Sequence, residues 1–116
     1  MGCGSRRISS SGLGRREFEA VFKKGRSSTS GGVVVYILPN HLPVFRLGFA
    51  VSRKVGNAVR RNRVRRLLRE VCRLNQAWFQ PGYDYVLLGM ASTGKAEYAA
   101  LEQAARRALR GPKVKE

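Results

Sequence analysis

The side chains best suited to chemistry in this sequence are arginines, which crowd residues 60–73. At 100° per residue, one side of a helix here carries Asn62, Arg65, Arg66, Arg69 and Arg73. The opposite side carries Val64, Leu67, Leu68, Val71 and Leu74. A guanidinium is always charged and binds two phosphate oxygens at once. Arginines at one-turn spacing therefore predict a surface for a sugar-phosphate backbone.

The first turns of this helix carry three further arginines, Arg60, Arg61 and Arg63. A helix N-terminus is positive, so each cation there is disfavoured by about 0.3–1 kcal/mol. The placement makes sense if an anion docks there and also uses the backbone N–H groups. The alternative is structural pairing of Glu70 with Arg66 one turn away, but one acid cannot neutralise so many arginines.

Aromatic residues are the second candidate for RNA contacts, because unpaired bases stack on aromatic rings. Phe18, Phe22, Tyr36 and Phe49 are the candidates. Each also fits a hydrophobic core, which burial statistics favour for the three phenylalanines taken singly. The sequence leaves both readings open.

A stretch from Gly89 to Ala96 fits the phosphate-loop pattern GxxxxGK but has Ala96 where a hydroxyl should bind Mg²⁺. A loop with Ser92 or Thr93 capping the last helix is the better interpretation. The isolated His41, Glu70 and Asp84 show no partners for acid–base work. We predict no catalytic residue and no metal site in the protein, so any chemistry comes from elsewhere.

The charge balance also points to a polyanion. Twenty-three Lys and Arg against seven acids give a net charge of +16 in 116 residues, and residues 20–69 hold twelve basic residues and no acid. A merely solvated basic face normally has acids interspersed. Nucleic acid or an anionic membrane would relieve the self-repulsion.

Cysteine usage and hydropathy favour a cytoplasmic protein. Cys3 and Cys72 have no metal-ligand spacing, and no apolar run is long enough to span a bilayer or form a secretory signal. The opening Met-Gly-Cys lacks the Ser or Thr that myristoylation needs, since Arg6 stands there.

Periodicity and turn signals predict one domain over residues 13–111, with a flexible basic leader at 1–12 and a flexible tail at 112–116. Helices are expected at 15–24, 57–76 and 95–110. Strands are expected at 33–38, 45–52 and 83–88, the last of them central, while 26–32 is either a loop or a short edge strand. The turn at 39–43 predicts that 33–38 and 45–52 pair as a hairpin.

The run from Gly48 to Glu70, with Arg61-Asn62-Arg63 at its centre, resembles the signature of the bacterial ribonuclease P protein family. The resemblance extends back to Phe18 and Phe22 and forward to the strand that opens with Tyr83, covering residues 13–110. It implies an α+β fold, an α/β sandwich with a mixed four-stranded sheet packed with helices. The implied order is α-β-β-β-α-β-α, with a left-handed β-α-β crossover against the usual right-handed rule.

The resemblance also implies a function: the protein component of ribonuclease P, which removes the 5′ leader from precursor tRNA. Its implied partners are ribonuclease P RNA and precursor tRNA, with no membrane and no small-molecule substrate. The RNA would perform the Mg²⁺-dependent hydrolysis, while the protein raises substrate affinity and eases the metal requirement. The residues implied to bind the catalytic RNA are Asn57, Arg60, Arg61, Asn62, Arg63, Arg65, Arg66 and Arg69. Those implied to bind the leader are Phe18, Phe22, Tyr36, Ser52, Arg53 and Lys54.

Two alternatives use the same charge. A general RNA-binding or ribosome-associated protein without a role in cleavage is the runner-up. A membrane-surface protein is disfavoured, because the apolar residues of the arginine-rich helix look like core.

Overall fold

The computed structural model describes residues 15–110, so the predicted leader at 1–12 and tail at 112–116 lie outside the described residues. Its helices are α2 (Arg15–Lys24), α3 (Ala58–Leu74) and α4 (Tyr98–Arg110). Its strands are β1 (Arg26–Ser30), β2 (Val33–Pro39), β3 (Arg46–Val51) and β4 (Tyr83–Gly89). Short 3₁₀ turns lie at η2 (Arg53–Val55), η3 (Gln76–Trp78) and η4 (Ala91–Lys95). The element order is the predicted one.

Residues 26–32 were predicted to form either a loop or a short edge strand. They contain β1, an edge strand that is hydrogen-bonded antiparallel to β2. The two strands are joined by Gly31 and Gly32, whose φ angles are 56° and 86°. Positive φ at both residues is the requirement of the tight hairpin turn that suits strand twist, and glycine meets it without strain. The β1–β2 hairpin is therefore specified locally.

The predicted hairpin between 33–38 and 45–52 is wrong. The sheet order is β1-β2-β4-β3, so β4 lies between β2 and β3 and pairs antiparallel with the first and parallel with the second. β4 is buried along most of its length, and a strand that is apolar on both faces is most stable at the centre of a sheet. The mixed sheet and the central β4 are confirmed, and β3, α3 and β4 form the parallel crossover that the resemblance implies to be left-handed.

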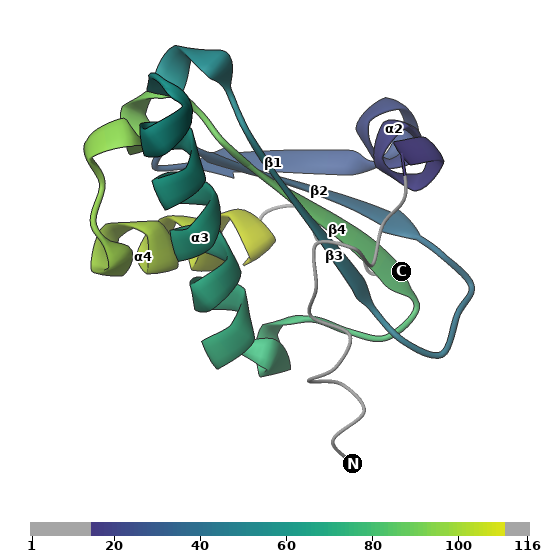
Figure 1. Cartoon of the computed structure of the whole chain (residues 1–116). Helices are drawn as coiled ribbons and strands as arrows, with labels where there is room; N and C mark the ends of the chain where they lie inside the picture. Colours follow the sequence, from purple (N-terminus) through teal and green to yellow (C-terminus); the bar gives the residue numbers. More distant parts are fainter. Residues whose placement is uncertain (1–14, 111–116) are drawn as a thin grey trace.

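Helices cover both faces of the sheet, as Figure 1 shows, with α3 and α4 on one face and α2 on the other. Leu47, Phe49 and Leu87 point to the α3–α4 side, where they join the main core with Leu68 and Leu101. On the α2 side, Val21 and Val86 form a smaller cluster that Phe18, Tyr36 and Leu38 adjoin. Alternation along the strands thus creates two layers of packing, and the sandwich is confirmed.

The helix boundaries differ from the prediction at two places. α3 ends at Leu74, which is 56% exposed, so its place in the apolar stripe is wrong. At 100° per residue Leu74 falls about 105° from the middle of the residues that are buried, which are Val64, Leu68, Val71 and Cys72. α4 begins only at Tyr98, and the hydroxyl of Thr93 donates to the Met90 carbonyl within η4 at 2.6 Å. The prediction that Ser92 or Thr93 caps the last helix is therefore wrong.

Candidate nucleic-acid interface

The N-terminus of α3 is set by Asn57. Its backbone is extended, and its side-chain oxygen accepts a hydrogen bond from the Arg60 N–H at 3.0 Å. This N-cap satisfies one of the backbone donors that a helix start leaves free. Asn57 therefore fixes where the arginines begin, and the first turn contains no acidic residue.

The arginines of α3 are distributed around much of the helix. Asn62, Arg66, Arg69 and Arg73 are exposed, and Arg65 on the same side is half-buried. We call this side the arginine ladder (Asn62, Arg65, Arg66, Arg69, Arg73). At 100° per residue Arg60 lies about 160° from the middle of the ladder, while Arg63 lies between the two, about 60° from Arg66. The eight residues predicted to bind RNA therefore spread around much of the helix circumference.

Two contacts order the ladder and its flank. Arg65 donates from Nη1 to the Asn62 side-chain oxygen at 2.7 Å, and Arg61 donates from Nη1 to the Gly56 carbonyl at 3.4 Å. The predicted pairing of Glu70 with Arg66 is wrong, because Glu70 forms a two-point ion pair with Arg73 instead. The hydrogen bond from Arg73 lowers the pKa of Glu70.

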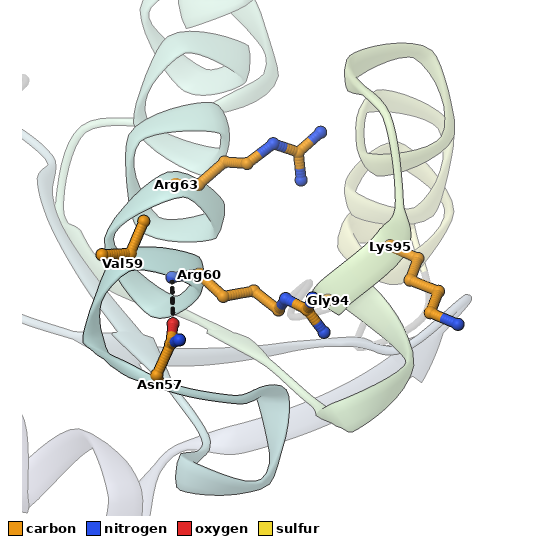
Figure 2. Close-up of a pocket in the computed structure, with 6 residues that line it drawn as sticks. All are labelled: Asn57, Val59, Arg60, Arg63, Gly94 and Lys95. Carbon is orange, nitrogen blue, oxygen red and sulfur yellow. Dashed lines mark hydrogen bonds between the residues drawn. The ribbon is translucent and has the colours of Figure 1, made fainter.

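The first turns of α3 line a hollow of about 510 Å³. Asn57, Val59, Arg60 and Arg63 form its α3 wall, and Gly94 and Lys95 of η4 form the opposite wall. Figure 2 shows the Arg60 side chain reaching toward Gly94, with Arg63 one turn above it and Lys95 beyond the glycine. No sequence pattern indicates that the segment resembling a phosphate loop meets the arginine-rich helix here.

The aromatic candidates separate by sheet face. On the α2 face, Phe22 lies between Phe18 and Tyr36, with ring centroids 5.8 and 4.7 Å apart, respectively. Phe22 is 38% exposed, while Phe18 and Tyr36 are half-buried. Phe49 is buried in the α3–α4 core, so the core reading holds for that residue. The structure thus gathers three of the four into one cluster.

Ser52, Arg53 and Lys54 follow the C-terminal end of β3. The Ser52 hydroxyl accepts a hydrogen bond from the Lys54 N–H at 3.1 Å and so caps η2, which leaves the Arg53 and Lys54 side chains exposed. Residues 46, 48, 50 and 52 alternate toward the α2 face, because Gly48 is the register partner of Val86 in the α2-side cluster. Ser52 and the aromatic cluster of Phe18, Phe22 and Tyr36 therefore lie on the same face of the sheet.

Sequence reasoning missed a buried polar group. Asp84 is 3% exposed and binds the Arg46 guanidinium, with Asn40 as a further donor. The sequence showed no structural partner for Asp84, because Arg46 opens a strand that is distant in sequence. The hydrogen bonds that Arg46 donates to the Asp84 carboxylate raise the pKa of Arg46.

Within residues 15–110, no three His, Cys, Asp or Glu side chains are gathered as a metal site would need. None of the helices described there has the length and apolar character to cross a membrane.

A mixed sheet between helices, with cationic walls on α3 and an aromatic cluster on the opposite face, defines a small basic α+β protein built to contact a polyanion. The chain belongs to the ribonuclease P protein family, whose model, Ribonuclease P, matches residues 13–113.

Relatives and solved structures agree with this assignment. The ribonuclease P protein component of Pelotomaculum thermopropionicum is 51% identical over 73 residues, which are 63% of this chain and 65% of the relative. The component of Alkaliphilus metalliredigens is 36% identical over 99 residues, which are 85% of this chain and 89% of the relative. The Staphylococcus aureus RNase P protein superposes with a TM-score of 0.77 at 28% identity, covering 88% of this chain and 94% of that one. The Thermotoga maritima protein gives 0.73 at 30% identity, with the same coverage.

Family membership confirms the fold and the general function implied by the resemblance. Members are protein components of a ribonucleoprotein endonuclease that acts in tRNA 5′ processing and whose catalytic part is RNA. The family thereby implies ribonuclease P RNA as a partner.

Proposed function

We propose that this protein binds the catalytic RNA through α3 and the single-stranded 5′ leader of precursor tRNA through the α2 face of the sheet. In this arrangement the RNA performs Mg²⁺-dependent hydrolysis in the cytoplasm, and the protein raises substrate affinity and eases the Mg²⁺ requirement. The observation that carries the proposal is the arginine ladder, whose exposed guanidiniums are spaced one turn apart on a helix with a single acid.

The catalytic-RNA contacts are assigned to Asn57, Arg60, Arg61, Asn62, Arg63, Arg65, Arg66 and Arg69. Arginine forks suit phosphate oxygens, and neutralising about five phosphates gives a log-log salt slope near −4.5 on the duplex scale. A slope of about −4.5 means roughly a 500-fold loss of affinity between 50 and 200 mM salt. Within this set, Asn57 positions the helix, because its side chain caps the helix N-terminus.

The leader contacts are assigned to Phe18, Phe22, Tyr36, Ser52, Arg53 and Lys54. An exposed edge of the aromatic cluster offers stacking to unpaired bases, and the cations of η2 offer charge to the backbone. Stacking is tolerant of base identity, which suits a leader whose sequence differs among precursors.

The test is cleavage of 5′-labelled precursor tRNA at low Mg²⁺ by the protein, by bacterial ribonuclease P RNA, and by the mixture. We expect efficient release of the leader only from the mixture, and loss of that gain with Arg61→Gln combined with Arg65→Gln. The matched control is Arg106→Gln with Arg107→Gln, which removes the same charge from exposed positions on α4.

If the protein binds RNA tightly but adds nothing to cleavage, the general RNA-binding alternative replaces this proposal. If the control pair removes the gain as fully as the α3 pair, net charge rather than the α3 surface is responsible.

A further inference from the structure

The hollow beside α3 lies where two parallel strands end. β3 and β4 finish at Val51 and Gly89, and the Ser52 N–H donates to the Gly89 carbonyl at 2.8 Å. From this edge η2 leads into α3, and η4 leads toward α4. Ligands of open α/β sheets bind outside the carboxyl ends of parallel strands, where such loops diverge. The position of the hollow thus matches a recurrent location for binding sites.

Three cations from two distant segments line the hollow. Arg60 and Arg63 come from α3 and Lys95 from η4, and none of the three forms an ion pair within residues 15–110. Figure 2 shows the Arg60 and Arg63 side chains extending from α3 toward η4, while the Lys95 side chain extends from η4 away from them. Arg60 and Arg63 carry the same charge, and an anion between them would offset their repulsion. Lys95 reaches the same anion when its side chain turns toward α3.

Gly94 brings the two walls together. A Cβ at this position would lie 3.0 Å from the Val55 carbonyl oxygen and 3.3 Å from Cδ of Arg60. A Cβ at Gly56 would also come within 3.0 Å of Arg60 Cδ. The aliphatic part of Arg60 therefore runs between two closely approaching loops, which limits the freedom of its guanidinium before any ligand binds. Less conformational entropy is then lost on binding.

We propose that this hollow binds a phosphodiester group of the ribonuclease P RNA, with Arg60, Arg63 and Lys95 contacting its oxygens. The inference rests on the proposed function of α3 as an RNA-binding helix, and it adds Lys95 as a contact outside that helix. Arg63 adjoins Arg66 of the arginine ladder, so the hollow extends the proposed RNA-binding surface of α3 toward η4.

The GxxxxGK-like segment thereby gains a role different from nucleotide binding. Its lysine ends η4, three residues before α4 begins, instead of standing at a helix start. Ala96 provides no hydroxyl for Mg²⁺. The segment serves as the second wall of a phosphate site whose first wall is α3.

The test is the affinity of the full-length protein for ribonuclease P RNA alone, measured at several salt concentrations. For Lys95→Gln we expect roughly five-fold weaker binding near 150 mM salt and a log-log slope reduced by about one. Lys95→Arg should restore both, because the charge returns. Arg106→Gln, on the exposed side of α4, is the control of equal charge loss and should change neither.

Gly94→Ala tests the geometry without changing charge. The added Cβ should displace Arg60 and weaken binding to a similar extent, with a circular-dichroism melt showing that the variant is folded at the assay temperature.

Three outcomes would overturn the inference. One is Lys95→Gln binding like the unaltered protein while Arg61→Gln with Arg65→Gln binds weakly, a result that leaves the proposed function of α3 standing. Another is a loss for Lys95→Gln that appears only with precursor tRNA, which would assign the hollow to the substrate. If neither the Lys95 variant nor the α3 pair weakens binding, the proposed function fails along with it.

Discussion

Asp84, at the start of β4, accepts two hydrogen bonds from Arg46, at the start of β3. They run from Nε to Oδ1 and from Nη2 to Oδ2, each at 2.8 Å. The two residues are also register partners in the parallel pair. Asn40 donates to the same Oδ1 at 2.7 Å, so one buried carboxylate joins both strands to the loop that precedes β3.

Replacing Arg46 with Met should destabilise the protein by about 3 kcal/mol, because it leaves the Asp84 carboxylate buried with a single side-chain donor. The value lies at the low end for a buried pair, since the Arg46 side chain is 24% exposed. Urea unfolding at neutral pH measures it. Arg73→Met, which breaks the exposed pair with Glu70, is the control and should barely move the midpoint.

Tyr85 should make stability fall at alkaline pH. Burial raises the pKa of its phenol, so ionisation favours the unfolded chain, whose tyrosines titrate at about 10. The stabilisation is complete below that pH and is lost as the pH rises toward the folded-state value. Tyr85→Phe should lower the free energy of unfolding by about 1 kcal/mol at neutral pH, because the phenol oxygen accepts a hydrogen bond from the Gln80 N–H. The free energy of unfolding of this variant should then fall less at alkaline pH than that of the unaltered protein. Urea unfolding at several alkaline pH values measures both proteins, and an equal loss of unfolding free energy with pH in the two would contradict this assignment.

Phe22→Ala should weaken binding of precursor tRNA to the assembled enzyme by about 1–3 kcal/mol, because it removes the most exposed ring of the aromatic cluster. Fluorescence titration at constant salt measures the affinity. A tRNA that lacks the leader is the matched control and should bind both proteins alike. Equal weakening for both RNAs would show that Phe22 supports the fold rather than the leader.

The Cys72 thiol should react with a thiol reagent only when the protein unfolds. Its side chain is fully buried and burial raises its pKa, so the native state offers neither access nor thiolate. In a Cys3→Ser background, labelling should accelerate with urea in parallel with the unfolded fraction. Rapid labelling without denaturant would mean that α3 opens locally.

Local patterns were sufficient for the elements of this fold but insufficient for their neighbours. The alternation of Leu47 and Phe49 with Gly48 indicates which face of β3 is buried, yet it contains no information about which strand lies beside it. The 39–43 turn was compatible with a hairpin, and only the buried central position of β4 decides against one. Strand pairing over long separations is a property of the whole chain.

The same distinction applies to the site. Helical periodicity is enough to define the arginine ladder, and it also places Arg63 beside the ladder and Arg60 on the other side of α3. The residue on the opposite wall of the hollow could not be predicted, because Lys95 is brought there by the packing of η4 against α3 and η2. Asp84 was likewise without an evident partner because Arg46 is 38 residues away.

The central place of β4 determines the order in which a ribosome can produce a folded molecule. When residue 82 has been joined, the β1–β2 hairpin can form, but β2 and β3 still lack the strand that separates them. The arginine helix is by then already synthesised, with no completed sheet to pack on. The sheet is completed only when strands distant in sequence pair with each other, and such pairing slows folding in general. The nascent chain therefore contains the arginines of α3 before it contains the central strand on which a stable interior depends.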